Sequence, residues 1–467
     1  KLLKPEKDYI NYLKNIKPIF HRLPKMHKIM GIVTGRLEKY RAITEDWLDL
    51  HGIRYESLTM FPTEYEKNRD KDHINEVGNF KSHIYTNSSA VFFMESSPYE
   101  SKVISLNGVD NDWTSAVFIT LEDGSIGFGQ MSTYNAEITS HVFHKQIAPW
   151  VIGQNWENFE NIENLILEKE HKFPGSYVLR AMAGLDTALW DLKGRIYQLP
   201  VVEMIGGEVG NLRVYGSSMK RDIKPEDEAK RFKILQDQKG VNAFKFRIGS
   251  ECGRGKDEWE GRTEEIVKKI NKELDPSTSK LVDANSCYSS EQAIEIGKML
   301  EDNNITHFEE PCPYWDLEET KKVTEALTID VTGGEQDYDF RVWRDMIKRK
   351  IVNIFQPDVM YMGGLTRILK LANIINKSGF MCTPHAANLS LVTVCTMHFL
   401  KAIPNAGKYL EYSIEGKDYY PWQDQLFSKH PFRISEGKVT ISNDPGWGVE
   451  INYNWLESSD YNVSELN

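Results

Sequence analysis

Three acidic residues recur at equal intervals in the second half of the chain. Asp283 in LVDANS, Glu309 in HFEEP and Glu335 in TGGEQ lie 26 residues apart, and each ends a short apolar run. A single acid at such a place is often a helix cap or a salt-bridge partner. Three carboxylates that face one point repel one another unless a cation lies between them, and hard oxygen ligands with open positions suit Mg²⁺. The spacing therefore favours a Mg²⁺ site built from these three acids.

The same stretch holds further residues that could move or stabilise a proton. They are Lys245 and Arg247 in the triplet KFR, Asp358 in FQPD, His385 in CTPHAANLS and Glu411 in YLEYS. Each of them also lies at the end of a short apolar run.

A repeated strand-helix pattern would bring these residues together. From about Leu212 the pattern recurs every 25 to 30 residues, which is typical of a parallel β/α barrel. The carboxyl ends of barrel strands converge on one mouth, so we expect the acids to meet in space. The polar insert at 250–262 is predicted to be a loop over that mouth. The candidate strands are 212–219, 241–249, 280–286, 306–311, 329–336, 351–358, 379–385 and 408–413.

Upstream of the barrel, the pattern changes to a compact α+β unit. Residues 115–130 alternate as two strands around Asp123-Gly124, which predicts a hairpin, and helical spacing follows at 148–166 and 176–207. The Gly-, Pro- and aromatic-rich tail after Glu411 lacks strong periodicity, and we expect it to pack back on this unit. The predicted domains are 1–105 (accessory segment), 106–211 (capping domain, first part), 212–420 (catalytic barrel) and 421–467 (capping domain, second part).

The first hundred residues are harder to interpret. Residues 31–61 predict a strand, a turn at Thr34-Gly35-Arg36, a helix and a second strand. With Thr34, Lys81 in FKSHIY and Glu95 in FMESS, the segment resembles the later half of a haloacid dehalogenase-like domain. The DxD motif of that family, which supplies its nucleophile, is missing upstream of Thr34. We therefore expect an accessory α/β segment without catalytic activity.

Composition excludes several function classes. The net charge of −11 argues against nucleic-acid binding, and no apolar run reaches the roughly 18 residues needed to span a bilayer. The five cysteines are scattered and lack CxxC spacing, which indicates reduced thiols. We expect a cytoplasmic protein that acts without a nucleic-acid or membrane partner.

The order of motifs resembles that of the enolase superfamily, mandelate racemase-like subgroup. The resemblance runs from about residue 113 to the end and rests on KFR, Asp283, Glu309, Glu335, the Asp358/His385 pair and Glu411. It implies an α/β fold, with an α+β capping domain over a modified (β/α)₇β TIM-type barrel. It also implies one essential Mg²⁺ and abstraction of a proton α to a carboxylate.

The residue types agree with the roles that the resemblance implies. Asp283, Glu309 and Glu335 would bind Mg²⁺, with Asn285 and Glu310 beside them. His385 would be the general base, because a histidine titrates near neutral pH and Asp358 can orient its ring. A lone histidine at a strand end can also be structural, but here the preceding strand end supplies an acid.

Three further residues would contact the substrate. Lys245 would neutralise its carboxylate, and Glu411 would be protonated and donate a hydrogen bond, unless it is only a helix cap. Arg247 departs from the subgroup pattern, in which two-base members have a lysine at this place. Arginine stays charged and is a poor base, so it would bind a substrate oxygen instead.

This departure favours one-base chemistry, namely dehydration of a polyhydroxy acid (an acid sugar) to a 2-keto-3-deoxy acid. An epimerase, racemase or cycloisomerase on the same scaffold is the first alternative, and an inactive barrel that serves in binding or assembly is the second. Specificity would lie near Gly129–Asn135 and Lys172–Tyr177 and in Tyr215, Trp315 and Trp422. A homo-oligomer is expected, as in related barrels.

Overall fold

The computed structural model divides the chain into two compact units, one of residues 1–111 with 457–461 and one of 112–456 with 462–467. None of the described helices is long and apolar enough to cross a membrane. The structure describes residues 31–50, 53, 55, 57–63, 80–81, 84, 116–120, 125–157, 159–420, 422, 425–452 and 454–455.

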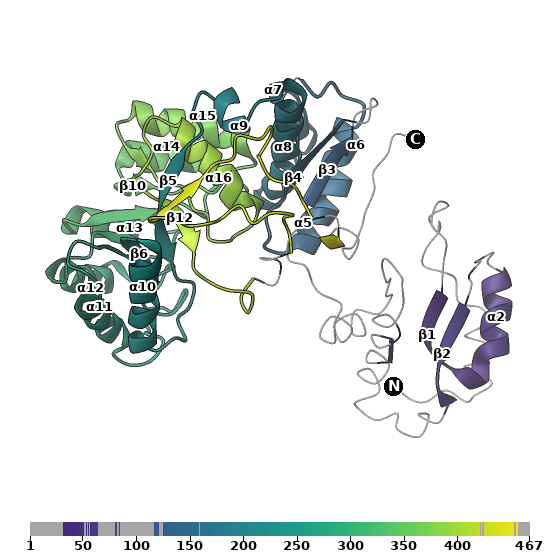
Figure 1. Ribbon diagram of the computed structural model, residues 1–467, viewed down its shortest axis with the longest axis horizontal. Helices are drawn as coiled ribbons and strands as arrows, with labels where there is room; N and C mark the ends of the chain where they lie inside the picture. Colours follow the sequence, from purple (N-terminus) through teal and green to yellow (C-terminus); the bar gives the residue numbers. More distant parts are fainter. Residues whose placement is uncertain are drawn as a thin grey trace. The chain divides into compact units, whose positions relative to one another are not determined.

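The first unit contains a small βαβ arrangement (Figure 1). Strands β1 (Gly31–Leu37) and β2 (Ser57–Phe61) are parallel, and helix α2 (Arg41–Leu50) connects them after the 3₁₀ turn η1 (Glu38–Tyr40). The predicted order of strand, helix and strand is confirmed. The turn predicted at Thr34–Arg36 is wrong, because the strand continues to Leu37. Glu95 and the predicted strand around it lie outside the described residues.

The second unit begins with the predicted hairpin, which packs on a long helix. Strands β3 (Ala116–Thr120) and β4 (Ile126–Gln130) pair antiparallel, and α8 (Ser176–Tyr197) lies against them (Figure 1). The approach is so close that a Cβ on Gly129 would lie 2.4 Å from the Ala188 nitrogen, so only glycine fits there. The other helices of this layer are α5 (Ala136–Val142), the π-helical turn η3 (Phe143–Ile147), α6 (Ala148–Val151), α7 (Phe159–Lys169) and α9 (Val201–Met204).

The barrel consists of seven strand-helix units followed by a final strand, as expected for a (β/α)₇β fold. Its strands run parallel in the order β11-β10-β9-β8-β7-β6-β5-β12, and the single parallel bridge Cys382↔Ala406 spans the remaining gap. All eight predicted strands are confirmed. They are β5 (Asn211–Ser217), β6 (Ala243–Arg247), β7 (Ser279–Asp283), β8 (His307–Glu309), β9 (Asp330–Gly333), β10 (Ile354–Phe355), β11 (Met381–Cys382) and β12 (Leu410–Ser413).

Seven helices surround the barrel: α10 (Pro225–Lys239), α11 (Arg262–Glu273), α12 (Ser290–Asp302), α13 (Leu317–Ala326), α14 (Phe340–Arg349), α15 (Leu365–Lys377) and α16 (Leu391–Ala402). They begin and end at residues suited to those places. Ser289 and Gln292 form a reciprocal capping box at the start of α12. The carboxylate of Asp316 caps α13, and that of Asp339 caps α14. Gly240 ends α10 with a φ of 69°, where an L-residue would be strained.

The C-terminal tail returns to the hairpin-and-helix layer. The Trp447 indole donates to the Thr187 carbonyl at 2.9 Å, and the Trp447 amide donates to Asp191 at 3.0 Å. Gly194 lies inside α8, and a Cβ there would be 2.6 Å from Gly446 Cα, so only glycine lets the tail approach this closely. The tail also adds strand β13 (Lys438–Thr440), antiparallel to β5, which the sequence pattern did not predict. The domain limits themselves stay predictions.

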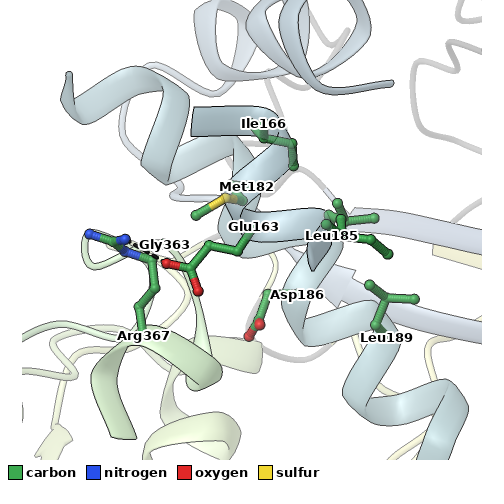
Figure 2. A pocket seen from close by; sticks show the side chains of 9 residues that line it. Glu163, Ile166, Met182, Leu185, Asp186, Leu189, Gly363 and Arg367 are labelled. Atoms are coloured by element: carbon green, nitrogen blue, oxygen red, sulfur yellow. Dashed lines mark hydrogen bonds and ion pairs between the residues drawn. The ribbon is translucent and has the colours of Figure 1, made fainter. Parts of the chain in front are cut away.

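Buried charges join this layer to the barrel. Glu163 of α7 pairs with Arg367 of α15 at 2.7 Å and with Lys370 at 2.9 Å. Asp186 of α8 accepts a hydrogen bond from the Thr366 amide at 3.2 Å, near the start of α15. Figure 2 shows Glu163, Asp186 and Arg367 around a small cavity. The cavity is lined by Ile162, Glu163, Ile166, Met182, Leu185, Asp186, Leu189, Gly363 and Arg367.

Candidate active site

The predicted metal ligands lie on neighbouring strands at the carboxyl rim of the barrel. Asp283 ends β7, Glu309 ends β8, and the two residues are direct partners in the parallel register. Glu335 lies two residues beyond the end of β9, the next strand. All three side chains are buried. The sheet therefore places the three acids on one rim, as the equal spacing predicted.

Lys245 lies among Glu309, Glu411 and Asp283 and is fully buried. Its Nζ atom is 2.6 Å from Glu309 Oε1, 2.8 Å from Glu411 Oε1 and 3.6 Å from Asp283 Oδ2. Burial disfavours the ammonium form, but Glu309 and Glu411 outweigh burial and raise the pKa of Lys245. The side chain is thus a fixed cation.

Arg247 lies two residues further along β6 and points to the same rim. Its Nη1 contacts the Asp283 carboxylate and donates to Asn285 Oδ1 at 2.7 Å, while Nε donates to the Ser218 carbonyl at 3.0 Å. The backbone nitrogen of Asn285 in turn donates to Asp283 Oδ1 at 2.8 Å. Asn285 therefore lies beside a predicted ligand, as expected, and links it to Arg247.

His385 and Asp358 come from adjacent strand ends and form an isolated parallel bridge. His385 Nδ1 lies 2.7 Å from Asp358 Oδ2, and Nε2 lies 3.5 Å from Glu335 Oε2. The amides of Met360 and Tyr361 donate to Asp358 Oδ1 at 2.7 and 3.0 Å, which fixes the carboxylate and so the ring. Burial opposes the imidazolium, but the nearby carboxylates, led by Glu335, outweigh burial and raise the pKa of His385 to about 10.

Glu411 is held in its ionised form, which differs from the protonated acid that we expected. Its Oε1 accepts from Ser217 Oγ at 2.8 Å and contacts Lys245, and its Oε2 accepts from the Ala386 amide at 2.9 Å. Burial favours the neutral acid, but Lys245 outweighs burial and holds the pKa of Glu411 well below its usual range.

Glu310, the neighbour of Glu309, has the opposite electrostatics. Burial, together with Glu335 and Glu309, raises the pKa of its carboxyl well above the usual range. Its Oε1 is buried, and no hydrogen-bond partner for it occurs in the described part of the chain. This environment therefore favours the neutral form of Glu310.

The aromatic residues predicted to bind substrate lie in three different settings. Tyr215 is buried inside the barrel, and Lys245 Nζ lies 5.6 Å from the centroid of its ring. Trp315 is 65% exposed and makes an edge contact with Tyr314. Trp422 is buried against Tyr420. Their roles in binding stay predictions.

The two loops predicted to set specificity meet. Asn135 Nδ2 donates to the Tyr177 hydroxyl at 3.0 Å, which links the segment after β4 to the start of α8. The predicted loop over the mouth is also tied to the rim, because the Cys252 amide donates to the Asn285 carbonyl at 2.9 Å.

Several neighbours of the site were not predicted. Gln356, two residues before Asp358, donates to Glu309 Oε2 at 2.7 Å, and its place in FQPD is a signal that could have identified it. Arg180 of α8 lies 3.3 Å from the ring centroid of Tyr361, whose ring centroid is 6.0 Å from that of His385. No sequence pattern around Arg180 predicts this contact, because the side chain reaches the site from a helix of another layer.

The donor set fits Mg²⁺ in its chemistry. Among the described residues, no three or more His, Cys, Asp and Glu side chains are grouped closely enough to hold a metal ion. Asp283 and Glu309 instead contact Lys245 and Arg247. Even so, three buried carboxylates on consecutive strands provide the hard oxygen ligands that Mg²⁺ prefers. The ligand assignment stays a prediction.

Comparisons with known proteins agree with this geometry. Residues 89–206 match the mandelate racemase/muconate lactonizing enzyme N-terminal domain, and residues 227–455 match the enolase C-terminal domain-like family. The arabinonate dehydratase of Saccharolobus solfataricus is 25% identical over 72% of this chain and 87% of its own length.

Solved structures show the same relationship. A protein of Roseobacter denitrificans, provisionally named a racemase, is 54% identical, with a TM-score of 0.75 over 76% of this chain and 97% of its own. A mandelate racemase/muconate lactonizing protein of Paracoccus denitrificans, complexed with magnesium, is 26% identical, with a TM-score of 0.68 over 74% of this chain and 93% of its own. The resemblance predicted from the motifs is confirmed: this chain belongs to the mandelate racemase/muconate lactonizing family of the enolase superfamily.

Proposed function

We propose that this enzyme is a Mg²⁺-dependent acid-sugar dehydratase that forms a 2-keto-3-deoxy acid. The supporting observation is an asymmetry of the barrel mouth. His385, oriented by Asp358 at 2.7 Å, lies on one side. Arg247 lies across the mouth, because β5 and β12 separate its strand β6 from β11. Arginine cannot serve as a second base, so the arrangement suits a reaction that needs one.

The proposed reaction uses His385 twice. Glu335 is the main cause of the raised pKa of His385, and a Mg²⁺ bound to Glu335 would offset that charge and favour the neutral imidazole. The neutral Nε2 takes the proton from the carbon next to the substrate carboxylate, and the electron pair of that C–H bond moves toward the carboxylate. As the pair returns to form a carbon-carbon double bond, the β C–O bond breaks. The leaving hydroxide takes the proton from the imidazolium and departs as water. The remaining enol becomes the 2-keto acid by moving its hydroxyl proton to carbon 3.

Positive charge would make the first proton removable. Lys245 is a fixed cation next to the expected substrate carboxylate, and such a group stabilises the charge that develops there. Asp283, Glu309 and Glu335 would hold the Mg²⁺. When bound, the ion would supply Lewis-acid stabilisation of the same negative charge.

The likeness to an arabinonate dehydratase supports the reaction class, at 25% identity over 72% of this chain. The more similar protein of Roseobacter denitrificans carries a racemase name, which favours epimerisation or racemisation as the second candidate. That reaction needs a proton donor on the face opposite His385. Arg247 makes it the weaker candidate.

The test is incubation of the purified protein with Mg²⁺ and a panel of aldonic and aldaric acids. Formation of 2-keto acid, detected with semicarbazide, is the expected result. Exchange of the α-proton in D₂O without loss of water would replace dehydration by epimerisation. If neither 2-keto acid nor exchange occurs with any acid, and Mg²⁺ does not bind, the barrel would be a binding or assembly module.

A further inference from the structure

One cation at the barrel mouth, Arg221, makes no ion pair within the described part of the chain, although Glu251 and Glu258 lie near enough to favour its charge. Arg221 lies in the loop between β5 and α10. Its Nε donates to the Gly249 carbonyl at 3.1 Å, and its Nη2 donates to Asn285 Oδ1 at 2.6 Å. Both acceptors are neutral oxygens. Within the described part of the chain, the structure records no ion pair for Arg221.

The neighbouring cations are compensated. Lys220 lies 3.1 Å from Asp418, and Arg231 lies 2.7 Å from Glu228 and 2.9 Å from Glu415. Arg221 comes from the same stretch of chain yet points toward the rim. Lys220 and Arg231 therefore belong to a network of ion pairs, whereas Arg221 makes no ion pair within the described part of the chain.

A second guanidinium converges on the same atom. Arg247 Nη1 donates to Asn285 Oδ1 at 2.7 Å, so a single amide oxygen accepts hydrogen bonds from two cations. Burial, followed by the repulsion of Arg247, lowers the pKa of Arg221 to about 10. Arg247 also contacts the Asp283 carboxylate, so Arg221 is the member of the pair that makes no ion pair within the described chain. A guanidinium held only by neutral acceptors beside a second cation is a place where an anion would be stabilised.

The position of the pair relates it to the catalytic residues. Gly249 follows β6 and Asn285 follows β7, so the contacts of Arg221 lie on the carboxyl rim that also carries Lys245 and His385. Arg221 uses two of its five N–H groups in the hydrogen bonds above, and the planar guanidinium fork matches a carboxylate.

We propose that Arg221, together with Arg247, binds a second carboxylate of the substrate, so that the preferred acid sugar is a diacid (an aldarate). This inference rests on the proposed function for the identity of the reaction. The carboxylate next to the reacting carbon would lie near Lys245. The distal carboxylate would lie at the Arg221–Arg247 pair, beside Asn285 Oδ1.

The kinetic test compares a six-carbon aldarate with the aldonate of the same configuration. The wild-type enzyme is expected to have the lower KM for the aldarate. Arg221→Gln should raise that KM roughly 10- to 100-fold, the usual worth of a charge-assisted hydrogen bond, and change the aldonate KM less than about threefold. Lys220→Gln removes a charge from the same loop and should leave the aldarate preference unchanged.

A binding measurement keeps this inference separate from the proposed reaction. Calorimetry with glutarate and with butyrate, both unreactive and both in the presence of Mg²⁺, should show tighter binding of the dicarboxylate. Arg221→Gln should abolish the difference, and Arg221→Lys, which keeps the charge but loses the fork, should retain part of it. If Arg221→Gln fails to fold, as judged by circular dichroism, Arg221→Lys carries the test.

The outcomes are distinguishable. Turnover of monoacids without any preference for diacids, or equal effects of Arg221→Gln on both classes, would overturn the inference and leave the dehydratase proposal standing. Preference for a phosphorylated aldonate over the aldarate would also overturn it. Tight glutarate binding that depends on Arg221, without turnover of any acid, would support the inference and reject the reaction.

Discussion

Two groups of buried charges in the second unit differ in how well their polar atoms are satisfied. At the barrel mouth, Lys245 contacts three carboxylates, yet buried atoms of Glu310, Gln356 and Tyr215 find no hydrogen-bond partner within the described chain. Where α7 and α8 meet α15, Glu163 and Arg367 pair with each other (Figure 2), and neither has a buried polar atom without a hydrogen-bond partner.

This difference suggests that the charges at the barrel mouth serve function, whereas those between α7, α8 and α15 serve stability. Buried polar groups are nearly always hydrogen bonded, so unpaired atoms close to the predicted ligands favour a site that is completed by a ligand. Unpaired atoms of Glu228, Arg262 and Trp455 lie elsewhere in the described chain. A satisfied ion pair between two layers needs no ligand and serves to join them. Substitutions at the mouth should therefore reduce turnover more than stability, and substitutions at the interface should do the reverse.

The largest effect is expected from His385→Asn. The variant loses the only proposed base, so kcat should fall roughly 10⁴-fold, toward the upper range for a general base. α-Proton exchange in D₂O should fall with it, whereas the melting temperature should change little, because asparagine can still donate to Asp358.

The control is Trp315→Phe, a change at an exposed aromatic side chain that keeps a ring there. It should retain kcat within about tenfold of the wild type, a loss far smaller than that of a general base. Near-normal turnover by His385→Asn would end the assignment of His385 as the base.

Next in size is the loss of stability expected from Arg367→Met. The substitution leaves Glu163 buried with only Lys370 at 2.9 Å, and breaking a buried ion pair on one side costs about 3–5 kcal/mol. Urea unfolding measures the loss, and kcat per folded molecule should stay within about threefold of the wild type.

Two variants sharpen this measurement. The double variant Glu163→Leu/Arg367→Met should recover much of the loss, because it removes both charges instead of one. Arg341→Met, at an 87% exposed side chain paired with Asp339, should cost less than about 1 kcal/mol. If the double variant is no more stable than Arg367→Met, the ion pair is not what joins the layers.

The two groups also differ in how far the sequence predicted them. Asp283, Glu309 and Glu335 could be found because each ends an apolar run at a regular interval, and the barrel topology converts that interval into proximity. The Asp358–His385 pair follows the same rule. These predictions depend on a local pattern repeated along the chain.

Contacts between layers have no such pattern. Arg180 over Tyr361, Glu163 with Arg367, and Trp447 on α8 join residues that are far apart in sequence, and each alone looks like an ordinary helix or loop residue. The sequence also does not reveal how deeply a side chain lies within the barrel. Tyr215 faces inward like Ser217, but only the structure shows that it lies beside Lys245 and is fully buried.

The smallest effect concerns Asp186, the second acid of the interface, and it depends on pH. Burial raises the pKa of Asp186 from 3.8 to about 7, so the folded protein binds this proton more tightly than the unfolded chain. That contribution to stability is complete below pH 3.8 and is lost as the pH rises through 7. Above this range a buried carboxylate remains, close to Glu163.

Asp186→Asn keeps an oxygen that can accept from the Thr366 amide but carries no charge. It should therefore be more stable than the wild type at pH 8, by on the order of 2 kcal/mol, and the gain should vanish near pH 4. Thermal unfolding across this range measures the difference, with the exposed Asp237→Asn as the control. A variant that is less stable at pH 8 would mean that the hydrogen bonds of the ionised acid outweigh its burial. Asp186 would then resemble the satisfied ion pair of Glu163 and Arg367.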